Sequence, residues 1–336
     1  MRLSSPVVAP RRKGDFVLRS RSLTKRYGDK VAVDALDLSL ERGRIYGLIG
    51  RNGAGKTTVM RMICGLVTPT SGDIELFGRS PRRGQGVRQE QLRRLGCLIE
   101  APGLQYGMSA RANLRLHRII RGVPSADVEG QLLELVGLAD VGAKQVGEFS
   151  LGMRQRLGIA VALVASPELL ILDEPVNGLD PVGVVEVRNL LVNLCRERGT
   201  TILVSSHNLP EMYQTATDYL IVDNGRLCES LSHAELEEHC SRYLTLRGSN
   251  VPGMVRALET MGVERMHVMS DGSVRLLDPP DNREELVRGL VAQDLVPTTV
   301  VEEGQTLEEY FLSVVDHTAQ PADVSEKNEK KENDRV

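Results

Sequence analysis

Tryptophan is absent from this 336-residue sequence, and aromatic residues make up only 3% of it. That scarcity argues against a platform on which the bases of single-stranded nucleic acid stack, and against the aromatic belt of a membrane protein. The formal net charge is only −3 at pH 7, which excludes nucleic acid binding through bulk positive charge. We therefore expect no nucleic acid partner.

The sequence also lacks an apolar run long enough to cross a bilayer. Its richest stretch, residues 157–172, is broken by Ser166, Pro167 and Glu168, whereas a spanning helix needs about 18 or more apolar residues in a row. No apolar segment of signal-peptide length follows the basic residues near Met1, so export is not expected. The five cysteines are far apart without metal-ligand spacing, which favours reduced thiols in a cytosolic protein.

Alternating strand-type and helix-type segments are present from Phe16 onward, and they predict an α/β layer architecture. Flat apolar runs, typical of strands covered on both faces, lie at 44–49, 95–99, 169–172 and 201–205. Helices are predicted at 56–65, 111–121, 127–136, 151–164 and 182–198. The dipeptide Asn224-Gly225 predicts a hairpin turn.

A second pattern begins after Ser241. Its order, βαββαβ, predicts a small α+β unit of the ferredoxin-like type over 241–316. The predicted elements are strands at 242–247, 265–269, 273–277 and 296–301, and helices at 252–261, 281–292 and 306–315. We also expect a flexible leader at 1–14 and a disordered tail at 317–336, since neither shows apolar periodicity.

The strongest motif is GRNGAGKTT at residues 50–58, which fits the phosphate-loop pattern G-x-x-x-x-G-K-[ST]. It follows an apolar strand and opens a helix, so its backbone N–H groups and the helix N-terminus can hold an anion. Lys56 would reach the β- and γ-phosphates of a nucleotide, and the Thr57 hydroxyl would bind Mg²⁺. The predicted nucleotide-binding residues are Gly50, Arg51, Asn52, Gly53, Ala54, Gly55, Lys56, Thr57 and Thr58.

An acidic pair ends the apolar run LLILDE at residues 169–174. Asp173 falls at the carboxyl end of a buried strand, where open α/β sheets bind their ligands. It can hold Mg²⁺, while Glu174 can orient or deprotonate an attacking water. Such a pair alone is more often a helix cap, and the nearby phosphate loop favours the catalytic interpretation.

The segment FSLGMRQRLGIA at residues 149–160 completes a recognisable series. The order GRNGAGKTT, FSLGMRQR, LLILDEP, NGLDP and SSH resembles the ATP-binding subunit of ABC transporters over residues 16–231. The resemblance implies an ABC ATP-binding domain at 15–240: a P-loop NTPase core with antiparallel β and helical subdomains. It also implies that ATP and Mg²⁺ are the cofactors.

The resemblance assigns further roles by position. It implies that Tyr27 stacks on adenine, although a ring there is also plausible as a plain strand residue. It also implies that His207 contacts the γ-phosphate and helps to hold water, although a lone histidine after a strand is usually structural. Ser150 and the Gly152 amide would bind the γ-phosphate in the partner subunit's site, and Asp180 would lie at the dimer seam. A homodimer closed over ATP follows from this arrangement.

Two departures from the usual pattern narrow the resemblance. Leu151 and Met153 stand at the first Gly and the Gln of the signature, and Glu100 in LGCLIEAPGL stands where most of the family has Gln. Both sequence differences resemble those of the ABC transporter branch that exports bacitracin-type and lantibiotic peptides. The Glu100 carboxylate could approach Mg²⁺ or pair with a basic coupling helix of the permease. In either case its negative charge would be repelled by the acidic pair at 173–174.

The expected function is an ATP hydrolase on the cytoplasmic face of the membrane, a peripheral subunit that powers export of an antibiotic or peptide through a separate integral membrane permease. The alternative is a non-transport ABC ATPase of translation or DNA repair. The translation type normally has two cassettes in one chain and the repair types have an interrupted one, so the single uninterrupted cassette disfavours both. A small-molecule kinase or GTPase would need a base-reading motif such as N-K-x-D, which the sequence lacks. For residues 241–315, packing or dimerisation and ligand sensing both stay open.

Overall fold

The computed structural model describes residues 15–79, 89–240, 243–263, 265–277 and 283–319. The chain divides into two compact units, which we call the first unit (residues 1–233) and the second unit (234–336). The predicted leader at 1–14 lies outside the described residues, as does residue 320 onward of the predicted tail.

A mostly parallel sheet forms the centre of the first unit. In the described part of the chain it has six strands in the order β10-β9-β4-β8-β7-β6, and only the β9–β10 pair is antiparallel. The strands are β4 (Ile45–Ile49), β6 (Leu95–Leu98), β7 (Leu169–Asp173), β8 (Thr201–Ser206), β9 (Asp218–Asp223) and β10 (Arg226–Ser232). Every residue of β4, β7 and β8 is buried, so the interpretation of these three runs as strands covered on both faces is confirmed. The fourth run forms the edge strand β6, in which Cys97 is exposed.

An antiparallel sheet accompanies the central one. Among the described residues it contains β1 (Phe16–Tyr27), β2 (Lys30–Leu36), β3 (Ser39–Glu41) and β5 (Ser71–Leu76), with β1 pairing with the other three. A single buried cluster contains residues of both sheets and of helix α1 (Lys56–Ile63), including Leu18, Leu48, Met60 and Ile171. The helix that begins at the phosphate loop is thereby fixed to both sheets.

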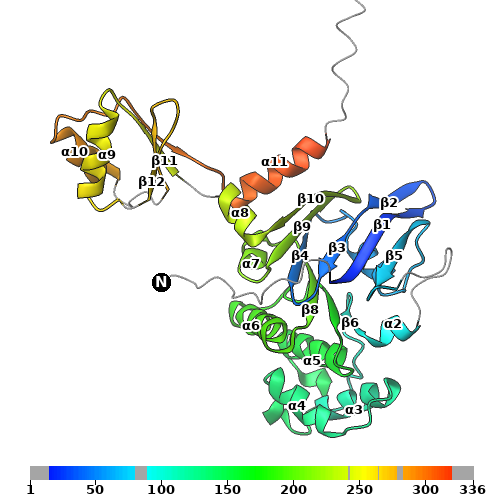
Figure 1. Ribbon diagram of the computed structural model, residues 1–336. Coiled ribbons are helices and arrows are strands. Elements are labelled where there is room, and N and C mark those ends of the chain that lie inside the picture. The colour runs from blue at the N-terminus through cyan, green and yellow to red at the C-terminus, as the bar shows by residue number, and fades with distance from the viewer. Residues whose placement is uncertain (1–14, 80–88, 241–242, 264, 278–282, 320–336) are drawn as a thin grey trace, which may run out of the picture. The chain divides into compact units, whose positions relative to one another are not determined.

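The predicted helices of the first unit are present, with bounds shifted by a residue or two. They are α1 (Lys56–Ile63), α3 (Ala110–Ile120), α4 (Asp127–Leu135), α5 (Leu151–Leu163) and α6 (Pro181–Arg198). The structure adds two short helices that the sequence pattern did not predict, α2 (Gln89–Arg93) and α7 (Leu209–Tyr213), and two short 3₁₀ turns, η1 (Ala139–Val141) and η2 (Val146–Glu148). Helices α3, α4 and α5 pack on one another and form a helical group at the lower end of the first unit in Figure 1. This arrangement matches the expected helical subdomain.

The second unit contains an antiparallel sheet with strand order β12-β13-β11-β14. Its strands are β11 (Tyr243–Arg247), β12 (Met266–Val268), β13 (Val274–Leu276) and β14 (Thr299–Glu303), and its helices are α8 (His233–His239), α9 (Val251–Thr260), α10 (Arg283–Val291) and α11 (Leu307–Ala319). Helices α9 and α10 share a buried cluster with the sheet. The element order is the predicted βαββαβ; the ferredoxin-like interpretation of this unit stays a prediction.

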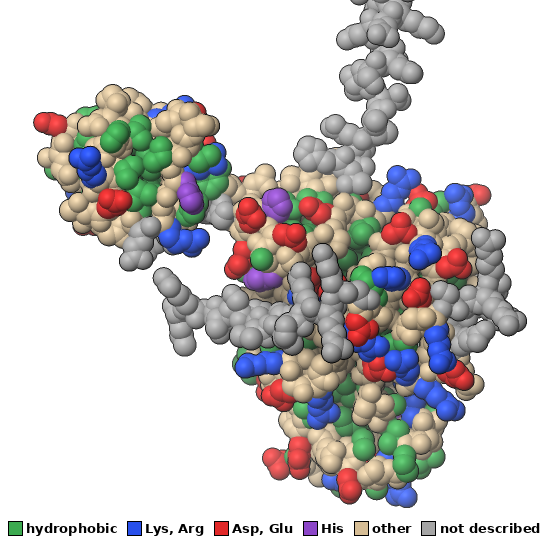
Figure 2. All heavy atoms as spheres, viewed as in Figure 1, with side chains coloured by type: hydrophobic (Ala, Val, Ile, Leu, Met, Phe, Trp, Pro, Cys, Tyr) green, Lys and Arg blue, Asp and Glu red, His purple; other side chains and the backbone are tan. Residues whose placement is uncertain are grey.

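Charged side chains of both signs are intermixed over the visible face of the first unit in Figure 2, in keeping with a net charge of −3. Among the described residues, no helix is both long and apolar enough to span a bilayer. All five cysteines are free thiols in the structure.

Candidate functional site

The phosphate loop connects β4 to α1, and its shape depends on two glycines. A Cβ atom at Gly50 would lie 2.4 Å from the carbonyl oxygen of Val222. Gly55 has a φ of +100°, and a Cβ there would lie 2.5 Å from the carbonyl oxygen of Ala32. No side chain fits at either position without moving backbone, so the neighbouring strands require the glycines of the motif.

The turn at Asn224-Gly225 supports the loop from outside its own segment. Both residues have positive φ, as a type I′ hairpin turn requires, and the predicted hairpin is formed by β9 and β10. The Gly225 N–H donates a hydrogen bond of 3.0 Å to the Ala54 carbonyl, while the Gly225 carbonyl accepts one of 2.9 Å from the Asp34 N–H. Residues distant in the sequence thus hold the phosphate loop in place.

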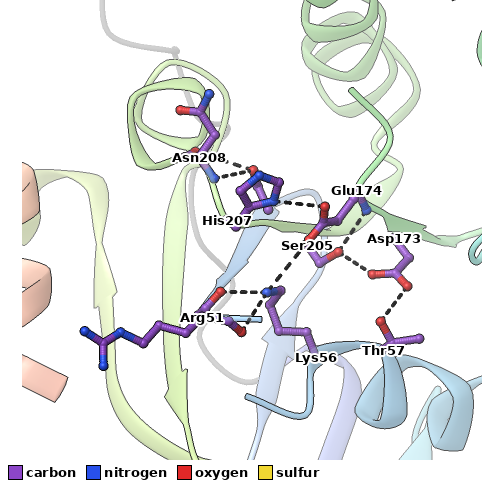
Figure 3. A network of polar contacts seen from close by, with 10 residues as sticks. Arg51, Lys56, Thr57, Asp173, Glu174, Ser205, His207 and Asn208 are labelled. Atoms are coloured by element: carbon purple, nitrogen blue, oxygen red, sulfur yellow. Dashed lines mark hydrogen bonds and ion pairs between the residues drawn. The ribbon is translucent and has the colours of Figure 1, made fainter. Parts of the chain in front are cut away.

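Lys56 is buried at the first position of α1. Its ammonium donates hydrogen bonds to the carbonyl oxygens of Gly50 (2.6 Å) and Arg51 (3.3 Å) and lies 3.8 Å from Glu174 Oε1 (Figure 3). Burial lowers the pKa of Lys56, and the charges of Glu174 and Asp173 oppose that shift. The loop therefore holds a cation directed at the predicted catalytic carboxylate.

Asp173 ends β7 and is fixed by two hydroxyl groups. Thr57 Oγ1 donates to Asp173 Oδ2 (2.8 Å), and Ser205 Oγ donates to Asp173 Oδ1 (2.6 Å). Ser205 also accepts a hydrogen bond of 2.9 Å from the backbone N–H of Glu174 (Figure 3). Sequence reasoning did not assign a role to Ser205; the available signal was a serine at the end of an otherwise apolar strand, inside the SSH motif.

The Thr57 hydroxyl and the Asp173 carboxylate form a pair of hard oxygen donors, which is the donor type that Mg²⁺ prefers. Among the described residues, no group of three or more His, Cys, Asp or Glu side chains could hold a metal ion. Mg²⁺ sites built from one or two protein ligands, completed by phosphate oxygens and water, are common. The residues present therefore fit the predicted magnesium ion.

Glu174 and His207, the two predicted catalytic residues, lie together. His207 Nδ1 is 2.9 Å from Glu174 Oε2, so that the ring N–H donates to the carboxylate (Figure 3). Glu174 has a φ of +47°, an unfavourable backbone conformation for a non-glycine residue that is found most often at functional sites. The two carboxylate oxygens thus face different groups, Lys56 on one side and His207 on the other.

Glu100 lies beside this network. Together with Thr57, Asp173 and Glu174 it lines a hollow of about 450 Å³. Its side chain is 62% exposed and forms an ion pair with Arg61 of α1, and its φ is +65°. The predicted approach of Glu100 to Mg²⁺ and its pairing with a coupling helix both stay predictions.

The remaining predicted residues lie at the ends of elements. Ser150 caps the N-terminus of α5 by accepting a hydrogen bond from the Met153 N–H (3.2 Å), and Gly152 lies in the first turn of that helix. Asp180 caps α6 in the same way, through the Gly183 N–H (2.9 Å). Tyr27 ends β1 with its side chain half-exposed.

Comparison with known proteins gives consistent matches. Residues 33–177 match the ABC transporter family. Over 300 residues the chain is 39% identical to the bacitracin transport ATP-binding protein BcrA of Bacillus licheniformis, covering 89% of this chain and 97% of that protein. It is 40% identical over 211 residues to the lantibiotic transport ATP-binding protein SrtF of Streptococcus pyogenes, covering 63% of this chain and 89% of that protein.

Among solved structures, the chain resembles cbiO1 from Clostridium perfringens, part of the ABC transporter complex cbiONQ. The TM-score is 0.60 at 25% identity, over 67% of this chain and 91% of that one. The phosphate loop, Asp173 and Glu174 all fall within the range that matches the family.

Proposed function

The chain belongs to the family of ABC transporter ATP-binding proteins, and on that basis we propose that it couples ATP hydrolysis to the export of a peptide antibiotic through a separate integral membrane permease. ATP hydrolysis is the characteristic activity of this family. The cargo class rests on relatives that are named for bacitracin and lantibiotic transport, one of which is matched over 97% of its length. The non-transport alternative finds no support among them.

The observation that carries the chemistry is the position of Glu174 between Lys56 and His207. A carboxylate held in this way can accept a proton from a water molecule that attacks the γ-phosphate. His207 holds one carboxylate oxygen and leaves the other facing the ammonium of Lys56. Lys56 and the loop N–H groups stabilise the negative charge of the β- and γ-phosphates during transfer.

Thr57 and Asp173 would hold Mg²⁺, with Glu100 as a further candidate ligand on the same hollow. The ion, when bound, neutralises charge on the phosphate oxygens during transfer. Ser205 keeps the Asp173 carboxylate in one orientation through its 2.6 Å hydrogen bond. The network thus uses one hydroxyl from the start of α1, that of Thr57, and one from the end region of β8, that of Ser205.

The proposed active form is a homodimer on the cytoplasmic face of the membrane, bound to the permease and without a nucleic acid partner. Ser150 is the N-cap of α5 and Gly152 lies in its first turn, where helix N–H groups favour an anion. In the dimer they would bind the γ-phosphate of the partner subunit's ATP, with Asp180 at the seam between subunits. Tyr27, exposed at the end of β1, would stack on adenine.

Substitution Glu174→Gln tests the assignment of the base. The amide keeps the shape of the side chain but cannot accept the proton, so turnover should fall by about 10²–10⁴-fold. ATP binding should persist, and the variant should elute from gel filtration as an ATP-dependent dimer. Wild-type turnover in this variant would overturn the assignment, whereas Glu197→Gln, an exposed position on α6, should retain full activity.

The transport role is tested in the organism that carries the gene. Deletion should raise sensitivity to bacitracin-type or lantibiotic peptides, and the wild-type gene should restore resistance while the Glu174→Gln gene should not. Unchanged sensitivity to every peptide of these classes would refute the proposed cargo without affecting the assignment of the ATPase.

A further inference from the structure

Two cysteines that are distant in the sequence meet in the first unit. Cys64 is the C-cap of α1, and Cys97 lies in β6. A Cβ at Gly96 would lie 2.3 Å from the carbonyl oxygen of Ala162 in α5, so Gly96 faces α5. Because successive strand residues point to opposite faces, Leu95 and Cys97 face away from α5. That other face contains the buried cluster in which Leu95 and Cys64 both lie.

Cys97 and Cys64 thus lie on the same side of the sheet, and each is the first cause of the other's shifted pKa. They differ in accessibility, because Cys64 is only 5% exposed whereas Cys97 is an exposed residue. Strand β6 is at the edge of the described sheet, so Cys97 is not enclosed by a further strand there. Cys97 is therefore the residue of the pair that a reagent from solution can reach, whereas Cys64 is buried.

The surroundings of Cys97 favour its thiolate. Hydrogen bonding from the Cys64 thiol, opposed by burial and assisted by the charge of Arg121, lowers the pKa of Cys97 to about 7. Arg121 is held nearby by hydrogen bonds to the carbonyl oxygens of Leu92 (3.2 Å) and Leu95 (2.8 Å). The same hydrogen bond and burial raise the pKa of Cys64, and burial raises the pKa of Cys195 to about 11.

We propose that Cys97 is a peroxide-reactive thiol and that Cys64 is its resolving partner, so that the two form a reversible disulfide. The Cys97 thiolate attacks one oxygen of hydrogen peroxide, breaks the O–O bond and, with uptake of one proton, yields a sulfenic acid and water. The Cys64 thiol then attacks that sulfur, the S–O bond breaks, and a second water leaves. In sum, two thiols are oxidised and one peroxide is reduced to two waters.

Cys64 and Cys97 are not part of the candidate ATPase site, but both lie on elements that lead to it. Arg61, one turn before Cys64 on α1, is the residue that pairs with Glu100, and Glu100 follows shortly after β6. The disulfide would therefore join the helix of the phosphate loop covalently to the strand that leads to Glu100. The chemistry does not require ATP hydrolysis, so it goes beyond the proposed function.

The experiment uses the full-length chain, reduced and then treated with hydrogen peroxide at pH 7, alkylated and analysed by peptide mass spectrometry. We expect a linked peptide pair containing Cys64 and Cys97 that dithiothreitol separates. In Cys64→Ser, oxidation should stop at a Cys97 sulfenic acid that dimedone traps, and in Cys97→Ser, Cys64 should stay reduced. The control Cys228→Ser and the variant Lys56→Ala should both give the wild-type linkage.

Alkylation rates give a second measurement that does not depend on peroxide. A lower pKa gives Cys97 a larger thiolate fraction than Cys195 at pH 7, but it also makes each thiolate less nucleophilic. Because the gain in thiolate outweighs that loss, we expect iodoacetamide to modify Cys97 at least about tenfold faster than Cys195. Oxidation that falls first on another cysteine, or a Cys97 sulfenic acid that persists in the wild-type chain without linkage to Cys64, would overturn the proposal. Equal alkylation rates at Cys97 and Cys195 would overturn it as well.

Discussion

Replacing Ser205 by alanine should loosen both Asp173 and Glu174, because one buried hydroxyl contacts each of them. A hydrogen bond to a charged group contributes about 1.5–3 kcal/mol, and a buried N–H left without an acceptor costs about 1–3 kcal/mol. The two bonds share one hydroxyl and are not additive, so the free energy of unfolding of the first unit should fall by about 2–4 kcal/mol. For a unit of this size that corresponds to a fall in Tm of about 5–15 °C.

Differential scanning calorimetry of the full-length chain measures this shift, and an ATPase assay with Mg²⁺ titration measures its consequence. In Ser205→Ala, Asp173 keeps only the Thr57 hydroxyl as a donor, and turnover should fall about tenfold or more because small misplacements in an active site are costly. Ser39→Ala, on the exposed face of β3, is the matched control. A Tm and a turnover both equal to those of the wild type would show that Ser205 does not position Asp173.

Three further substitutions have defined outcomes. Gly50→Ala should abolish ATP binding, measured by titration with a fluorescent ATP analogue, because its Cβ would lie 2.4 Å from the Val222 carbonyl oxygen; retained affinity would show that the loop can widen. Hydrogen bonding from Arg94 lowers the pKa of Glu168, so that ion pair contributes stability above the unfolded-state pKa of about 4.3 and loses it as pH falls through the folded value. Since the side chain of Glu168 is 37% exposed, Glu168→Gln should cost about 1 kcal/mol or less at pH 7, and the difference should vanish in acid unfolding experiments. Glu100→Gln should change stability by about 0.5 kcal/mol or less while raising the Mg²⁺ concentration for half-maximal ATPase activity, and an unchanged Mg²⁺ requirement would remove this carboxylate from the metal site.

Local signals explain what could be predicted from the sequence. The buried strands β4, β7 and β8 are continuous apolar runs, and the phosphate loop is a compact motif, so both can be recognised from local sequence alone. Helix α6 begins one residue earlier than its predicted start because Asp180 caps it and proline suits the first helical position.

What the sequence could not reveal depends on pairs of residues that only the fold brings together. The hydroxyl of Ser205 reaches Asp173 because β7 and β8 are neighbours with Asp173 opposite Ser205, and no local pattern encodes that register. The nearness of Cys64 and Cys97 likewise depends on the end of α1 packing on the same face of the sheet as Leu95 of β6. The ion pair of Glu100 with Arg61 also joins α1 to the segment after β6.

The central position of β4 has a consequence for how the protein is made. Its neighbours in the sheet, β8 and β9, are synthesised long after it. During translation both edges of the buried strand β4 therefore lack their pairing partners. Such long-range pairing slows folding and exposes the nascent chain to aggregation. The phosphate loop, whose Ala54 carbonyl accepts a hydrogen bond from the Gly225 N–H, should therefore take its final shape only after the hairpin of β9 and β10 has been synthesised.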